Sequence, residues 1–310
     1  MLKRSILYLT TLIISFALLY TATYYWLTHS KNTFGRPVIT EWQKELLYHR
    51  FPSEISFKTL DTIQQQIDYL IIGSSHAYRN FNPAIFEKNG FTCFNIGSSS
   101  QTPSNSYALL EQYITKCNSV IYEVYPVTLG IEGTEAFYVL NNDLENFTTL
   151  SNMALSINNF RTYNLLSLHY WLKQSIQKLT VDTARFYNGY IATFDSVNAF
   201  INYDSITLNK KTIDTQIHFI DKAISLCKKH NKPISLVYAP VPSKLIIKDE
   251  YYAIDKLNKL ANKHSIVFLN WGRNHNLNDA HHFFDDDHLN AAGVDLFNTY
   301  LLDRIKKADE

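Results

Sequence analysis

The stretch that decides the fold reads Asp68-Tyr69-Leu70-Ile71-Ile72-Gly73-Ser74-Ser75-His76, a short apolar run followed by a glycine and two serines. A short apolar run bounded by turn-forming residues is typical of a buried strand in a parallel sheet. A glycine followed by hydroxyl residues permits a sharp turn and leaves a serine at the carboxyl end of the strand. Because Gly-Ser turns are common, this pattern alone predicts only a strand and a turn.

Further along the chain, short apolar runs alternate with helical patterns. Repeated strand–helix–strand units predict a three-layer α/β/α domain of the flavodoxin-like type, with a parallel sheet. Functional residues in such sheets gather at the carboxyl ends of the strands. The predicted strands are Tyr69–Ile72, Thr92–Ile96, Ser119–Val124, Ile234–Tyr238 and Ile266–Leu269. The predicted helices are Ser106–Cys117, Asp214–His230, Asp255–His264 and a last helix capped by Asn290, with Val294, Phe297, Leu301 and Ile305 on its buried stripe.

Composition divides the chain into three parts. Residues 1–30 form an apolar N-terminal segment, and residues 31–60 form a polar juxtamembrane connector with one amphipathic helix near Glu41–Tyr48. Residues 61–310 form the α/β domain. Within that domain, residues of about 128–211 interrupt the alternation and are rich in Tyr, Phe, Asn and Leu. We expect a mostly helical insertion there, lying over the carboxyl ends of the strands as a lid.

The N-terminal segment is long enough to cross a membrane. No residue from Ser5 to Leu27 is charged, and about 23 residues give a helix of roughly 34 Å. Lys3 and Arg4 precede this run, and three aromatic residues at 24–26 close it, as interfacial aromatics do. A cleaved signal peptide is the alternative, but its apolar core is usually shorter, roughly 7–15 residues. The sequence therefore predicts an uncleaved single-pass anchor, with the N-terminus in the cytoplasm and the domain on the periplasmic or extracellular side.

Composition also excludes several classes of protein. Hydrophobic residues make up 46% and charged residues 18%, which argues against intrinsic disorder. Lys plus Arg total 29 and Asp plus Glu total 28, whereas non-specific nucleic-acid binding needs a clearly basic surface. We therefore expect no nucleic-acid partner. The chain has three cysteines, Cys93, Cys117 and Cys227, and no Cys-x-x-Cys pair. The odd number excludes a disulfide framework, and we expect all three thiols to be buried.

A second cluster of reactive side chains lies near the C-terminus, in Phe284-Asp285-Asp286-Asp287-His288. Asp285 and His288 are three residues apart, so a helical turn would place them within hydrogen-bond reach. A carboxylate on one imidazole nitrogen leaves the other nitrogen to face a serine. Asp286 and Asp287 lack this spacing, and we expect them to matter less. The structural alternative is an acidic helix N-terminus that complements the helix dipole.

Together these blocks resemble the SGNH (GDSL-like) hydrolase superfamily, over residues of about 68–307. Gly73-Ser74-Ser75 is similar to the block that carries the nucleophile, with Ser74 in place of the usual aspartate, and the cluster ending in His288 is similar to the Asp-x-x-His block. The resemblance implies a triad of Ser75, His288 and Asp285. Residues 95–100 resemble the second block, which implies an oxyanion hole formed by the backbone N–H groups of Ser75 and Ser100.

The third block of the superfamily is absent. After the third predicted strand the chain reads Tyr122-Glu123-Val124-Tyr125-Pro126, with no Gly-x-Asn-Asp. Loss of one oxyanion-hole donor typically slows an enzyme about 100- to 1,000-fold. Either another side chain substitutes, or the site is slow, or it takes an acyl group from a carrier protein. The Gly-Ser-Ser start, the missing block and the anchor are similar to a divergent branch, which includes the D-alanyl transfer protein of teichoic-acid synthesis and alginate-type O-acetyltransferases.

The resemblance implies a membrane-anchored serine esterase or O-acyltransferase that needs no cofactor or metal. Its substrate would be an acyl ester of an envelope glycan or similar compound, and its partner a polysaccharide or an acyl-carrying protein. Two alternatives stay open. The missing block favours a non-catalytic glycan-binding or envelope-assembly protein. The carboxylates of Asp285–Asp287 with His281, His282 and His288 favour a metal-dependent phosphoesterase.

His76 is a possible second base, because it follows Ser75 directly. Adjacent residues at a turn usually point apart. We therefore expect His76 to face solvent or to bond within its loop.

Overall fold

The computed structural model describes residues 2–29, 59–131, 186–193 and 205–309. They belong to two units, residues Met1–Tyr48 and His49–Glu310. The expected amphipathic helix near Glu41–Tyr48, the connector up to residue 58 and most of the expected insertion lie outside the described residues.

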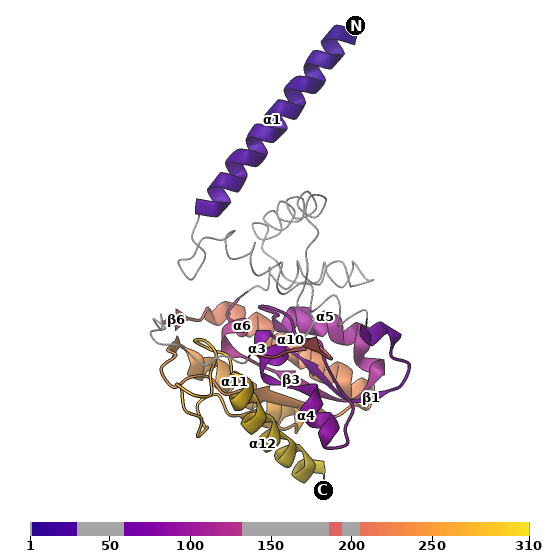
Figure 1. The fold of residues 1–310 in the computed structure, drawn as a ribbon, viewed down its shortest axis with the longest axis vertical. Helices are drawn as coiled ribbons and strands as arrows, with labels where there is room; N and C mark the ends of the chain where they lie inside the picture. Colours follow the sequence, from indigo (N-terminus) through magenta and orange to yellow (C-terminus); the bar gives the residue numbers. More distant parts are fainter. Residues whose placement is uncertain (1, 30–58, 132–185, 194–204, 310) are drawn as a thin grey trace. The chain divides into compact units, whose positions relative to one another are not determined.

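A five-stranded parallel sheet forms the centre of the second unit (Figure 1). Its strand order is β2-β1-β3-β7-β9, and every neighbouring pair is parallel. All five predicted apolar runs are strands of this sheet, so the predicted α/β fold class is confirmed. The strands are β1 (Ile67–Ile72), β2 (Cys93–Asn95), β3 (Cys117–Glu123), β7 (Ile234–Tyr238) and β9 (Phe268–Asn270).

Helices cover both faces of the sheet, as right-handed crossovers between parallel strands require. On one face α12 packs against α3 and α4, and on the other α10 packs against α5, α6 and α11 (Figure 1). Ile71, Phe86 and Phe297 belong to one buried cluster on the α12 side. The helices are α3 (Ser75–Asn80), α4 (Pro83–Lys88), α5 (Pro103–Tyr113), α6 (Pro126–Leu129), α10 (Lys210–Lys229), α11 (Glu250–His264) and α12 (Ala291–Asp309).

The four predicted helices are confirmed, with shifted ends. α5 begins earlier than expected because Thr102 and Asn105 form a capping box and Pro103 takes the first helical position. α12 begins as predicted: Asn290 Oδ1 accepts the Gly293 N–H at 3.0 Å. The expected stripe of α12 is buried throughout. The short helices α3 and α4 were not predicted, because six residues carry too little periodicity.

The described part of residues 128–211 contains short strands. β4 (Phe186–Tyr187) and β5 (Tyr190–Ile191) form a hairpin whose Asn188-Gly189 turn has positive φ at both residues. β6 (Ile206–Thr207) pairs in parallel with β8 (Ile247–Lys248). The hairpin lies against β2, because the Asn95 N–H donates to Asn188 O at 2.9 Å.

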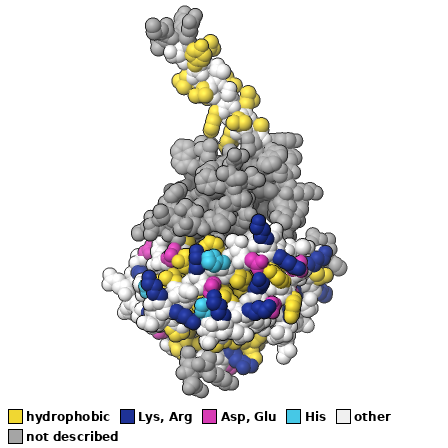
Figure 2. All heavy atoms as spheres, turned by 180° about the vertical axis from the view of Figure 1, so that it is seen from behind, with side chains coloured by type: hydrophobic (Ala, Val, Ile, Leu, Met, Phe, Trp, Pro, Cys, Tyr) yellow, Lys and Arg dark blue, Asp and Glu magenta, His cyan; other side chains and the backbone are white. Residues whose placement is uncertain are grey.

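The first unit is described only by α1 (Leu2–His29). Within the described residues it is the one helix long and apolar enough to cross a membrane, over Ser5–Ala22 with a mean hydropathy of 1.8; a signal sequence would meet the same criteria. Its apolar side chains are exposed, as Leu12 at 67% and Leu19 at 68% illustrate. Figure 2 shows these apolar side chains along the helix.

The three cysteines are free and buried, as predicted. Burial raises the pKa of Cys117 to about 11 and that of Cys227 to about 12. Thiols of this kind stay protonated at neutral pH and make poor nucleophiles.

Charges on the second unit are mixed. Lys263 pairs with Asp221 and Lys256 with Asp214. On the face drawn in Figure 2, Lys and Arg side chains are scattered among acidic and uncharged ones.

Candidate active site

Ser75, His288 and Asp285 come together at the carboxyl end of β1. Ser75 is the first residue of α3 and is half-buried, while Ser74 and His76 on either side are buried. Its Oγ lies 2.8 Å from His288 Nε2. The other ring nitrogen, Nδ1, lies 2.9 Å from both carboxylate oxygens of Asp285. Two segments 213 residues apart in sequence therefore form one hydrogen-bonded series.

The turn after β1 explains why Ser75, and not Ser74, faces outward. A Cβ at Gly73 would lie 2.6 Å from Glu123 Oε2, so only glycine fits beside that carboxylate. The N–H and Oγ of Ser74 donate to Glu123 Oε2 at 2.9 and 2.8 Å. Ser74 Oγ also accepts the His76 N–H at 3.2 Å and so caps α3. Ser74 is tied into the fold, which leaves Ser75 at the surface.

Glu123 is a site residue that sequence reasoning missed. It ends β3, at the point where the expected third block is absent, and its side chain is buried. Burial raises the pKa of its carboxyl group, an effect that nearby His76 and the bonds from Ser74 partly offset. Among the described residues, its Oε1 has no hydrogen-bond partner. A carboxylate at the end of an otherwise apolar strand was the available signal, because a buried charge needs a partner.

The carboxylates around His288 correct one expectation. Asp287, which we expected to matter less than Asp285, has its Oδ1 2.7 Å from His288 Nδ1. The segment is an irregular turn closed by the Phe284 N–H donating to His288 O at 2.9 Å, so helical spacing does not govern which carboxylate reaches the ring. Asp285 also accepts the backbone N–H groups of Asp287 and His288, at 3.1 and 2.7 Å. Two carboxylates therefore flank Nδ1.

This pairing controls the protonation of His288. Burial favours the neutral ring, but the charges of Asp285 and Asp287 outweigh it and raise the pKa of His288 to about 10. Burial likewise favours protonated Asp287, but His288 and His76 outweigh it and hold its pKa well below the usual range. Asp286 differs, because burial and its acidic neighbours raise its pKa. At neutral pH the resting site thus holds an imidazolium between carboxylates, and the fraction of neutral His288 grows as the pH rises.

His76 does not face solvent, contrary to one part of our expectation. Its side chain is fully buried, and its ring stacks on Tyr125 with the centroids 3.8 Å apart. Its Nε2 lies 3.4 Å from Asp287 Oδ2, and its Nδ1 lies 3.3 Å from Asn80 Nδ2. Successive residues of a helix point about 100° apart. α3 therefore turns His76 inward beneath Asp287 while Ser75 stays at the surface.

The loop that carries Ser100 lies against the Ser75 turn. A Cβ at Gly97 would lie 2.7 Å from Ala77 Cβ, and the Ser98 N–H donates to Gly73 O at 3.2 Å. Ser100 is half-buried and has a φ of 50°. The second predicted block thus adjoins the first, and the roles of the Ser75 and Ser100 N–H groups in an oxyanion hole stay predictions.

Only some of the potential metal ligands near His288 in the sequence lie close together in the structure. His76, Asp287 and His288 each offer a ligand atom within 4.8 Å of the others, as do Asp285–Asp287. His282 belongs to neither group, and its Nδ1 accepts the Asn278 N–H at 2.8 Å. In the first group, hydrogen bonds and ion pairs among the side chains account for the arrangement.

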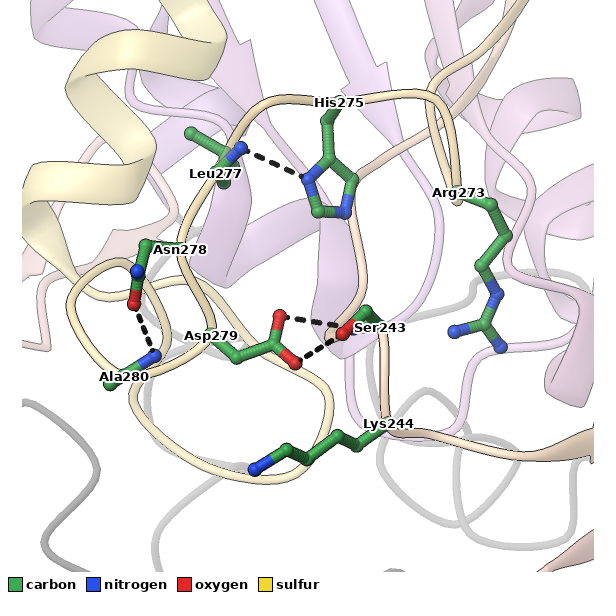
Figure 3. A pocket seen from close by; sticks show the side chains of 8 residues that line it. All are labelled: Ser243, Lys244, Arg273, His275, Leu277, Asn278, Asp279 and Ala280. Atoms are coloured by element: carbon green, nitrogen blue, oxygen red, sulfur yellow. Dashed lines mark hydrogen bonds between the residues drawn. The ribbon is translucent and has the colours of Figure 1, made fainter.

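A separate pocket of about 610 Å³ lies in the loops after β7 and β9 (Figure 3). Asp279 in this pocket accepts hydrogen bonds from the N–H and Oγ of Ser243, at 3.0 and 2.6 Å. Neither the serine nor the histidine and carboxylates of the candidate site line it. The lining residues are Ser243, Lys244, Arg273, His275, Leu277, Asn278, Asp279 and Ala280.

No protein-family model and no curated protein matches the chain. Among solved structures, the chain is similar to a GDSL-like lipase from Bacteroides thetaiotaomicron, with a TM-score of 0.47 and 14% identity over 83% of this chain and 98% of the other. It is also similar to a mutant of an acetylxylan esterase from Geobacillus stearothermophilus, with a TM-score of 0.39 and 13% identity over 77% of this chain and 94% of the other.

Proposed function

We propose that the protein is a serine esterase or O-acyltransferase of the SGNH type. The observation that carries the proposal is the contact of 2.8 Å between Ser75 Oγ and His288 Nε2, with Asp285 on the opposite ring nitrogen. A serine, an imidazole and a carboxylate in this order are the machinery of nucleophilic acyl transfer.

In the proposed reaction, Ser75 Oγ attacks the acyl carbon of an ester while neutral His288 accepts the hydroxyl proton at Nε2. Asp285 and Asp287 stabilise the imidazolium that forms. The tetrahedral intermediate collapses when His288 returns the proton to the leaving alkoxide, which leaves an acyl group on Ser75. Attack by water then completes hydrolysis, whereas attack by a sugar hydroxyl completes acyl transfer. The backbone N–H groups of Ser75 and Ser100 are the proposed oxyanion donors.

We further propose that α1 anchors the protein in a membrane, with the second unit on the periplasmic or extracellular side. The length and apolar surface of α1 support an anchor. The proposed substrate is an acyl ester of an envelope glycan or similar compound, or an acyl group on a carrier protein.

Turnover of p-nitrophenyl acetate by the full-length protein in detergent micelles tests the reaction. We expect Ser75→Ala to abolish turnover and Ser243→Ala, at the exposed serine of the separate pocket, to keep it. Equal rates for the wild-type and Ser75→Ala proteins would contradict the proposal. If the folded wild-type protein turns over no ester at any pH, the non-catalytic glycan-binding alternative takes its place.

A further inference from the structure

Beneath Ser75 and His288, a second series of polar contacts ends on the main chain. The Leu289 N–H donates to Asn80 Oδ1 at 3.1 Å, and both residues are buried. A backbone N–H can only donate, so this bond assigns the oxygen of the Asn80 amide to the Leu289 side. The amide nitrogen, Nδ2, then faces His76 Nδ1 at 3.3 Å.

This assignment determines the tautomer of His76. An amide NH₂ group donates, so His76 Nδ1 accepts and the ring proton is on Nε2. That nitrogen donates to Asp287 Oδ2 at 3.4 Å. The other oxygen of Asp287, Oδ1, lies 2.7 Å from His288 Nδ1. With carboxylates on Nδ1, His288 keeps its proton there and gives up the proton on Nε2, the nitrogen that faces Ser75.

We propose that His76 and Asn80 are positioning residues, which hold Asp287 and, through it, the His288 ring in the tautomer that Ser75 needs. The inference rests on the proposed function of the Ser75–His288 pair. The stack of His76 on Tyr125 and its full burial fix the ring between Asn80 and Asp287. Its centroid lies 4.8 Å from that of His288, close enough for its charge state to act on the catalytic ring.

Replacing the amide donor of Asn80 by an acceptor tests the direction of the hydrogen bond between residue 80 and His76. In Asn80→Asp, one oxygen can still accept the Leu289 N–H, while the other presents an acceptor to His76 Nδ1. His76 then holds protons on both nitrogens and carries a positive charge beside Asp287. The added carboxylate and the added imidazolium cancel in net charge, but the imidazolium lies next to His288. The pKa of His288 therefore falls, and its neutral form appears at lower pH.

The groups around His288 come from three elements. They are Asp285, Asp286 and Asp287 on its own loop, His76 and Arg79 on α3, and Glu123 at the end of β3 with Tyr125, which follows that strand and precedes α6. Of these, the substitution at position 80 acts directly on His76 alone.

The first experiment measures the tautomer itself. Two-dimensional ¹H–¹⁵N spectra of the full-length protein in detergent micelles, labelled with ¹⁵N-histidine, report which ring nitrogen is protonated, and His76→Gln assigns the signals. We expect His76 with the proton on Nε2. A proton on Nδ1 overturns the proposal, whatever the activity of the protein.

The second experiment measures the rate at which a fluorophosphonate labels Ser75 as a function of pH. We expect the midpoint for Asn80→Asp to fall by about one unit or more relative to wild type. Asn89→Asp makes the same change at the exposed end of α4 and should leave the midpoint unchanged. An unchanged midpoint in a folded Asn80→Asp protein overturns the inference while the proposed function stands. Absence of any labelling of the folded wild type at any pH overturns the proposed function and, with it, the inference that rests on that function.

A pair of substitutions at His76 separates positioning from packing. His76→Gln keeps an N–H donor near the place of Nε2 but loses the stack on Tyr125, whereas His76→Phe keeps the stack and loses the donor. We expect the fluorophosphonate to label Ser75 about tenfold faster in His76→Gln than in His76→Phe, because the Phe variant loses a charge-assisted hydrogen bond to Asp287. Equal rates, or faster labelling of Phe, contradict a positioning role.

Discussion

The Oδ1 atom of Asp287 lies 2.7 Å from Nδ1 of His288, closer than either oxygen of Asp285 at 2.9 Å. The proposed base is therefore held by two carboxylates, where the sequence blocks indicate one. Asp285 also accepts two backbone N–H groups, whereas Asp287 is bonded to His76. Asp285 shapes the turn that carries His288, and Asp287 links the ring to α3.

Ser75 and His288 are expected to act as a unit. Ser75→Ala and His288→Ala should each reduce ester turnover to a similar low floor, and the double variant should be no slower than either single variant. The reason is that a serine is a weak nucleophile without its base, so each change removes the same step. Steady-state kinetics of the three proteins check this. Losses that add in the double variant would mean that the two side chains act independently.

Removal of either carboxylate is expected to reduce activity only in part, because the other carboxylate still contacts Nδ1 of His288. We expect Asp285→Asn and Asp287→Asn each to lower kcat/KM by about 10- to 100-fold, and the double variant to approach the loss of about 10,000-fold seen when a triad loses its only carboxylate. Asp286→Asn is the matched control and should stay within a few-fold of wild type. A loss at Asp287 no larger than at Asp286 would contradict the contact.

The pH dependence follows from the raised pKa of His288, about 10. Because catalysis needs the neutral ring, kcat/KM should rise with pH from neutrality toward that value. Asp287→Asn removes one of the raising charges, so its rising limb should lie at lower pH. A profile already flat above pH 7 in the wild type would contradict the double carboxylate pairing.

The same pKa shift affects stability in a defined direction. The pKa of histidine in the unfolded chain is about 6.5, so the folded state binds this proton more tightly. The stabilisation is fully present below about pH 6.5 and is lost as the pH rises toward about 10. Chemical denaturation of the wild type and His288→Gln should show free energies of unfolding that converge as the pH rises. Curves that stay parallel over this range would exclude the shift.

Substitutions of Ser74 and Ser75 are expected to affect different properties, stability for Ser74 and turnover for Ser75. Ser74→Ala removes the hydroxyl that donates to buried Glu123, and we expect a loss of about 1–3 kcal/mol in the free energy of unfolding with most turnover kept. Ser75→Ala should show the opposite pattern, with near wild-type stability and no turnover. Melting temperatures and initial rates of both variants check this. If Ser74 proves essential and Ser75 dispensable, the assignment of the nucleophile is wrong.

The apolar and helical patterns of the sequence predicted the sheet and the long helices, whereas the contact between Ser75 and His288 was implied by the resemblance of two sequence blocks to a known family. Apolar runs such as Ile234–Tyr238 and the helix cap at Asn290 are local patterns. Local patterns predict a strand or a helix end without knowledge of the rest of the fold. The partners of Glu123 and Asn80 could not be predicted, because no local pattern and no family block indicates the distant residue that each contacts: Glu123 bonds to Ser74, and Asn80 to Leu289. The contact of Asp287 with His288 does not follow from helical spacing, because the segment folds as an irregular turn.

The proposed membrane anchor leads to a topological expectation. A reporter enzyme that works only outside the cytoplasm, fused after Glu310, should be active, because a single N-terminal span with its N-terminus inside places the rest of the chain outside. The matched control is the same fusion with a reporter that works only in the cytoplasm, which should be silent. Activity of the cytoplasmic reporter instead would reverse the orientation and remove envelope substrates from consideration.

The most direct test of the central claim is the site of covalent labelling. The full-length protein in detergent micelles is treated with a fluorophosphonate at alkaline pH, where His288 is neutral, and the adduct is located by peptide mass spectrometry. We predict a single adduct on Ser75, and no adduct in His288→Ala under the same conditions. An adduct on Ser74 or another residue, or equal labelling of His288→Ala, would contradict the claim that Ser75 is a nucleophile activated by His288.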